Sequence, residues 1–263
     1  MRTPSPALAE FVESLWWFTG ELAHARERIV PDGAMGLLVN LDEDELRSYH
    51  GDELASVERV TGAALCGAWG HSFGIDTAEQ RCIAGVSFKP GGAAPFFHAP
   101  ASETAEQHVA LEALWGRGAR SVRERLLEAE SPEAALETLE SLLLSHLARP
   151  LAPDPALRFA VAALERGAAV GAVQERLGLA PKRFIARFRN GVGLTPKRFA
   201  RVRRFQRVLE SLPPDGRVDW CDVAARCGYF DQAHLIRDFR ELAGMTPTEY
   251  RPHAPDRRDH VAV

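Results

Sequence analysis

The chain has 263 residues, of which 46% are hydrophobic and 26% charged, and its net charge is −4. This size and composition predict one or two folded domains with a sizeable core, and they exclude a largely disordered protein. No apolar run reaches the roughly 18 residues of a membrane span, and the first residues lack the basic region and cleavage site of a signal peptide. We therefore expect a cytoplasmic protein without a membrane partner.

Short apolar and aromatic runs, bounded by Gly, Pro and Asp, fill the first third of the chain. They lie at residues 14–22, 36–41, 45–50, 64–69 and 82–88. Runs of this kind are typical of strands, so we expect a small antiparallel sheet or barrel.

From about Ser102 to His146 the pattern becomes helical. One predicted helix face carries leucines at spacings of three and four, namely Leu136, Leu139, Leu143 and Leu147. Such a stripe is more often the core of a domain than the seam of a dimer.

A proline-rich segment, RPLAPDP at residues 149–155, separates two parts of different character. Each proline lacks an amide hydrogen and disfavours helical geometry in the residue before it. We therefore predict an α+β protein. It has a β-rich N-terminal sensor or dimerisation domain with trailing helices at 1–148, a linker at 149–156, an all-α domain at 157–252 and a flexible tail at 253–263.

A divergent repeat of helix, tight turn and helix follows the linker. In the first copy an apolar helix face leads to Gly178, and a second helix begins at Pro181. In the second copy a similar face leads to Gly228, and a second helix begins at Asp231. The bend glycines and the apolar spacing of both copies predict two helix-turn-helix units.

The two copies also end alike, with Gly-Leu-Thr-Pro at 193–196 and Gly-Met-Thr-Pro at 244–247. Glycine can take the left-handed conformation that ends a helix, and Thr-Pro suits the first turn of the next one. The sequence therefore predicts a connecting helix between the copies, from Pro196 to about Leu212.

Charge is distributed unevenly, with a net −11 over residues 1–153 and +7 over residues 154–263. The segment Pro181–Arg207 contains ten cations and no acid. Ten unpaired cations would repel one another in an isolated domain, which indicates a polyanionic partner. Nucleic acid is the first candidate and an anionic membrane surface the second.

The outer faces of the second helices are the candidate base-reading surfaces, because a helix-turn-helix unit places its second helix in the major groove. In the second copy the candidates are Gln232, Ala233, His234, Arg237 and Arg240. Arg237 has the donor geometry for guanine and Gln232 the geometry for adenine.

In the first copy the outward candidates are Lys182, Arg183, Ala186 and Arg187. Their cations suit phosphate contacts, which position a protein on DNA without reading its sequence. Lys197 and Arg198, at the start of the connecting helix, complete the predicted DNA-binding set. We expect no catalytic residue, no metal and no cofactor.

Residues 219–251, and within them GYFDQAHLIRDFR and GMTPTEYR, resemble the signature of the AraC/XylS family of bacterial transcriptional regulators. Residues 177–212 are similar to the other helix-turn-helix unit of that family and its connecting helix. The resemblance covers about 155–251, and it implies two motifs joined by one long helix that enter successive major-groove segments of double-stranded DNA. The chain departs from the family pattern at Phe230 and Ala186, where many members have Ser and Arg, so the first motif is expected to read bases less directly.

Three segments of the N-terminal half, 28–33, 85–93 and 114–116, resemble an uncharacterised domain that often precedes such DNA-binding units. This resemblance implies a sensor or dimerisation role. We accordingly expect a small-molecule effector, a contact with RNA polymerase and a homodimer as further partners.

Several residues admit more than one interpretation. Four of the tryptophans, Trp16, Trp17, Trp69 and Trp115, could line a ligand pocket or fill the core. The alternative function is an enzyme, such as a DNA-repair alkyltransferase, with a nucleophilic cysteine at Cys66 or Cys82. Neither cysteine has the flanking motif of such enzymes, and the four cysteines form no CxxC pair, so we expect reduced thiols.

Overall fold

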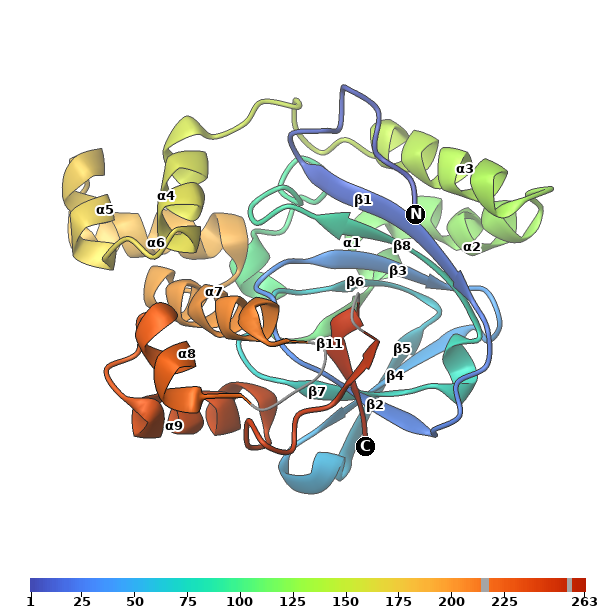
Figure 1. The fold of residues 1–263 in the computed structure, drawn as a ribbon. Helices are drawn as coiled ribbons and strands as arrows, with labels where there is room; N and C mark the ends of the chain where they lie inside the picture. The colour runs from blue at the N-terminus through green and yellow to red at the C-terminus, as the bar shows by residue number, and fades with distance from the viewer. Residues whose placement is uncertain (214–217, 255–256) are drawn as a thin grey trace.

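Two antiparallel sheets face each other in the N-terminal half of the structure, a computed structural model that describes residues 1–213, 218–254 and 257–263 (Figure 1). The first sheet has the order β1 (Val12–Thr19), β8 (Cys82–Phe88), β3 (Gly36–Asn40), β6 (Ala63–Cys66) and β9 (His108–Ala110). The second has the order β10 (Pro252–Ala254), β11 (Arg257–Ala262), β2 (Arg26–Ile29), β7 (Phe73–Asp76), β4 (Glu45–His50) and β5 (Ser56–Thr61).

Each of the five predicted apolar runs overlaps a strand, namely β1, β3, β4, β6 and β8. Other strands were missed because their side chains do not alternate in the expected way. Almost all side chains of β5 are exposed, and the short β2 buries a glutamate, Glu27. The sequence predicted a small antiparallel sheet or barrel, and the structure has two antiparallel sheets that pack face to face.

Three helices follow the sheets, α1 (Leu111–Trp115), α2 (Arg120–Leu127) and α3 (Pro132–Ser145). Short 3-10 helices occur at Asp52–Leu54, Ala78–Gln80, Ala101–Glu103 and Gly116–Ala119. Ser131 caps α3 by accepting the N–H of Ala134, and Leu136, Leu139 and Leu143 are buried in the core as predicted. Leu147 lies beyond the end of this helix and is partly exposed.

The C-terminal helices are α4 (Pro155–Glu165), α5 (Val170–Leu177), α6 (Pro181–Val192), α7 (Pro196–Ser211), α8 (Trp220–Arg226) and α9 (Gln232–Ala243). The long helix α7 lies between the α4–α6 group and the α8–α9 group (Figure 1). Its inner face, which includes Phe199, Val202 and Phe205, is fully buried. The repeat is therefore two helix pairs joined by one central helix, as the sequence predicts.

The end of the chain corrects one expectation. Residues 253–263 were predicted to be a flexible tail, but β11 pairs with β2 of the N-terminal sheet, with His260 opposite Ile29. Val261 is buried, and His260 pairs with the buried Glu27. The prediction was wrong because these partners lie more than 200 residues away in the chain and leave no local pattern.

Candidate functional site

Each helix-turn-helix unit is built by local capping. Gly178, in the left-handed conformation with φ 62°, ends α5, and Pro181 begins α6. In the second unit Asp231 caps α9 by accepting the N–H of His234, and Gly244 ends it with φ 69°. These positions need glycine because other residues are strained at positive φ.

Helix α9 separates a buried face from an exposed one. Leu235, Phe239 and Leu242 are each 1% exposed. Arg237 and Arg240, spaced three apart, lie on the exposed side and have no ion pair among the described residues. Two guanidinium groups are thus presented to solvent from the second helix of the second unit, as predicted.

Helix α6 has the same division. Phe184 and Phe188 are buried, while Lys182 and Arg183 are exposed and without an ion pair in the described part of the chain. Arg189 shares this exposure and was missed as a candidate, although its spacing of seven from Lys182 places it on the same stripe. Ile185, between the two buried phenylalanines, is 44% exposed.

The prediction of ten unpaired cations over 181–207 is wrong for half of them. Ion pairs join Arg187 to Asp154, Arg198 to Glu106, Arg201 to Asp238 and Glu241, Arg203 to Glu165, and Arg204 to Asp238. The acids come from other segments, so a count within the segment could not reveal them. Lys182, Arg183, Arg189 and Lys197 are the exposed cations of this segment that have no acid partner among the described residues.

Asp238 connects the second unit to the central helix. Its Oδ1 accepts from Arg201 Nε at 2.7 Å, and its Oδ2 accepts from Arg204 Nη2 at 2.8 Å. The Asp238 side chain is 6% exposed. Burying a carboxylate requires partners of this kind, so the pair of arginines fixes α9 against α7.

Two predicted base contacts have protein partners in this state. Gln232 Oε1 accepts from the thiol of Cys221 at 3.3 Å, and the His234 ring lies edge-on to Tyr229 with ring centroids 5.1 Å apart. Arg198 Nη2 lies 3.0 Å from Glu106 Oε1 in the N-terminal half. Their DNA contacts, and that of Arg187, stay predictions.

One further feature was missed. Phe230, at the turn before α9, is 92% exposed. The sequence departs from the family pattern at this position, but its exposure was not predicted, because a phenylalanine is usually buried. Its exposure beside the cap of α9 adds an apolar group to the outer end of that helix.

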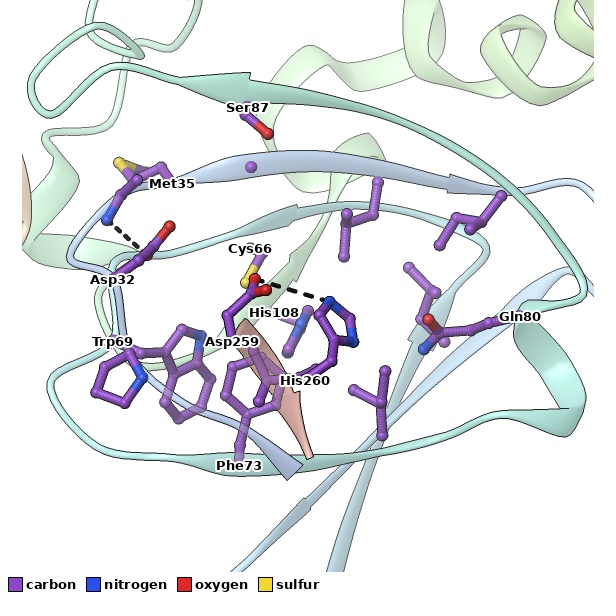
Figure 2. Close-up of a pocket in the computed structure, with 18 of the residues that line it drawn as sticks. Asp32, Met35, Cys66, Trp69, Phe73, Gln80, Ser87, His108, Asp259 and His260 are labelled. Atoms are coloured by element: carbon purple, nitrogen blue, oxygen red, sulfur yellow. Dashed lines mark hydrogen bonds and ion pairs between the residues drawn. The ribbon is translucent and has the colours of Figure 1, made fainter. Parts of the chain in front are cut away.

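A cavity of about 190 Å³ lies between the two sheets (Figure 2). Most of its walls are apolar, and two of the four candidate tryptophans, Trp16 and Trp69, line it. Trp115 instead stacks on His146, with ring centroids 4.4 Å apart. Small-molecule sites are concave and mostly apolar with a few polar groups, and this cavity has that character.

Burial favours the neutral forms of two polar groups at the cavity, His108 and Cys66. Burial lowers the pKa of His108 to about 4, and the nearby His50 lowers it further in the same direction. Burial raises the pKa of the Cys66 thiol to about 12. A thiol that stays protonated is a weak nucleophile, which argues against Cys66 in the enzyme alternative.

The wall of the cavity also contacts the central helix. Pro31 O accepts from Gln206 Nε2 at 2.6 Å, and Asp32 O accepts from Arg203 Nη1 at 3.2 Å. The next residue, Gly33, has φ 81°, and a Cβ there would lie 3.2 Å from the ring of Phe199. The loop between β2 and β3 therefore lines the cavity on one side and packs against α7 on the other.

Glu27 holds the C-terminal strand in place. Its carboxylate is fully buried and pairs with His260 Nδ1 at 2.6 Å and His24 Nε2 at 2.9 Å. Burial acts to raise its pKa, but hydrogen bonds and charge from His260, His24 and Arg257 together hold it at about 2.

We expect this carboxylate to make stability depend on pH. Its pKa is lowered in the folded state, so its contribution is complete above about pH 4.5 and is lost as the pH falls towards 2. The shift corresponds to about 3 kcal/mol of unfolding free energy. Denaturant unfolding should show Glu27→Gln less stable than the parent at pH 7, with the difference shrinking towards pH 2. A constant difference would contradict the assignment, and Glu13→Gln, at an exposed site, is the control.

Comparison with known proteins gives matches in both halves. Residues 1–110 match a family described as a domain of unknown function (DUF6597), and residues 173–253 match a helix-turn-helix domain family. A probable transcriptional regulator, LumQ of Photobacterium leiognathi, is 32% identical over 73 residues. That segment spans 28% of this chain and only 29% of the relative.

Among solved structures, an apo variant of ToxT from Vibrio cholerae is similar, with 10% identity and a TM-score of 0.47. The match covers 92% of this chain and 96% of that one. ToxT from Vibrio cholerae O395 bound to (E)-4-(8-methylnaphthalen-1-yl)but-3-enoic acid matches with 9% identity and a TM-score of 0.47, over 90% and 98% of the chains. None of the described helices is long and apolar enough to cross a membrane. The chain thus joins a segment that matches a domain of unknown function, residues 1–110, to one that matches a helix-turn-helix domain family, residues 173–253, and the second match agrees with the resemblance of that segment to the AraC/XylS signature.

Proposed function

We propose that this protein is a sequence-specific DNA-binding transcriptional regulator whose two helix-turn-helix units bind adjacent major-groove segments. The observation that carries the proposal is the division of α6 and α9, each of which buries apolar side chains inward and exposes cations that have no ion pair in the described part of the structure. The second helix of such a unit enters the major groove, where guanidinium groups can pair with guanine. The LumQ relative supports the regulatory role, because its name describes it as a probable transcriptional regulator.

Selection of bound sequences from a random pool of duplexes tests the proposal. We expect an asymmetric site of about two helical turns, because two units on one rigid helix would reach neighbouring grooves. The logarithm of the affinity should fall linearly with the logarithm of the salt concentration, by about 0.9 per phosphate neutralised. A salt-independent affinity, or a pool that yields no preferred sequence, would contradict the proposal.

Replacing Lys182 tests whether this residue contacts a phosphate or a base. We expect Lys182→Ala to weaken binding to specific and random duplexes by the same factor and to make the salt slope shallower by about 0.9. The control is Arg125→Ala, which removes an exposed cation from α2 in the N-terminal half. If the Lys182 variant changed the selected sequence, Lys182 would be a base contact and our assignment would be wrong.

The cavity between the sheets is the proposed site of an effector. Its support is the combination of apolar walls, a volume of about 190 Å³ and the loop at Pro31 to Gly33 that also packs on α7. A ligand that shifts this loop would move the helix that connects both DNA-binding units. Effector and DNA would then change each other's affinity by the same factor, as linkage requires. Contact with RNA polymerase and homodimerisation remain predictions.

A further inference from the structure

Two carboxylates that are far apart in the sequence line the same cavity. Asp32 follows β2, Asp259 lies on β11, and both line the space between the sheets (Figure 2). Asp32 has protein on several sides, but the residue is exposed to solvent. The two residues come from the N-terminal domain and from the strand that follows the DNA-binding units.

Neither carboxylate is fully neutralised by the protein. Asp32 Oδ1 accepts the backbone N–H of Ala34 at 2.9 Å, and the described residues give it no ion pair. Asp259 has the imidazole of His260 at 3.7 Å, but that ring also serves the buried Glu27. Two carboxylates therefore line the cavity, and among the described residues neither has a cation that pairs with it alone.

Burial and the charge of Asp259 both disfavour the ionised form of Asp32. Desolvation raises the pKa of Asp32, and the negative charge of Asp259 raises it further, while the Ala34 N–H and Arg203 act in the opposite direction. A positive group between them would remove this repulsion, and an anion would add to it. Arg47, the other guanidinium at the cavity, is already paired with Glu43, Glu45 and Asp76.

The remaining walls suit a flat apolar body with a polar end. Trp69 is 4% exposed and packs against Phe73 with ring centroids 4.5 Å apart, and its indole group faces the Cys66 thiol. His108 Nδ1 is buried without a hydrogen-bond partner among the described residues. Aromatic faces attract cations as well as apolar groups, and unpartnered buried polar atoms are costly unless a ligand satisfies them.

We propose that the cavity binds a small organic ammonium with an aromatic or apolar body, and that its charge lies between Asp32 and Asp259. The effect of such a ligand on transcription rests on the proposed function, but its binding does not. Asp259 belongs to β11, and the Asp32 backbone contacts α7. A bound cation would therefore tie the C-terminal strand to the loop that supports the central helix.

Three probes of the same shape and different charge test the proposal on the full chain without DNA. They are phenethylammonium, phenethyl alcohol and phenylacetate, titrated calorimetrically at pH 7. We expect the ammonium to bind roughly tenfold more tightly than the alcohol and phenylacetate to bind weakest. Preference for phenylacetate, equal affinities for all three, or no binding of the ammonium would each overturn the proposal.

Substitutions of the two carboxylates test whether the ammonium group of the ligand lies between them. Asp32→Asn keeps the oxygen that accepts the Ala34 N–H, so the turn should persist while the preference for ammonium over alcohol falls to about threefold or less. Asp259→Asn should act in the same direction, and Glu13→Gln, an exposed acid on β1, should leave the preference unchanged. Thermal unfolding of each variant confirms that it is folded. An unchanged preference in a folded Asp32→Asn, or a loss in Glu13→Gln, would overturn the assignment.

The result is separable from the proposed regulatory role. If the ammonium binds as expected but leaves the affinity for the selected duplex unchanged, the cavity site stands and its regulatory role fails. If the protein binds DNA but none of the probes, the DNA-binding proposal stands and the ligand class is wrong.

Discussion

Replacing Arg237 with alanine is expected to weaken binding to the selected duplex by about 1–3 kcal/mol, which is roughly a tenfold to hundredfold loss. Arg237 is exposed on the outer face of α9 and, unlike Arg201 and Arg204, has no acid partner in the described structure. Its guanidinium is therefore free to donate two hydrogen bonds to guanine. The variant should also tolerate other bases at one position of the site, which repeated selection from the random pool would reveal.

Arg226→Ala is the matched control for this effect. Arg226 lies on α8, the first helix of the same unit, and pairs with Asp222 at 2.9 Å. We expect its loss to change affinity little and to leave the selected sequence unchanged. If Arg237→Ala weakened specific and random duplexes alike, Arg237 would be a phosphate contact and the proposed reading by α9 would be wrong.

Asp238→Ala is expected to lower the free energy of unfolding by about 3 kcal/mol. The substitution leaves Arg201 and Arg204 close together, partly buried and without their shared acid, and removing one partner of a buried pair is costly. Both arginines retain some contact with water, which keeps the loss towards the lower end of the range for buried pairs. Denaturant unfolding monitored by circular dichroism measures the difference.

Glu241→Ala provides the comparison. Glu241 lies one turn after Asp238 on α9 and also pairs with Arg201, but its side chain is 66% exposed. Exposed ion pairs contribute little, so we expect a loss below about 1 kcal/mol. Equal losses in the two variants would show that Asp238 does not brace α9 against α7. DNA binding should weaken in Asp238→Ala, since the second unit would lose its fixed position on the central helix.

The sequence by itself determined the DNA-binding units, because their signals are local. Bend glycines such as Gly178 and Gly244, a cap such as Asp231 and apolar residues at spacings of three and four lie within a few turns of one another. Hydrogen bonding and burial in a helix depend on such neighbours, so the helices, their inner faces and the exposed Arg237 could be predicted.

Only the tertiary structure decided which cations have an acid partner, where the C-terminal strand lies and which residues line the cavity. Arg198 pairs with Glu106, β11 pairs with β2, and Asp32 and Asp259 line the same cavity. Each of these arrangements involves segments that are far apart in the chain, so no local sequence pattern predicts it. A charge is neutralised or left open by whatever folding places within a few ångströms, so its role follows from the packed structure and not from the residues beside it in sequence.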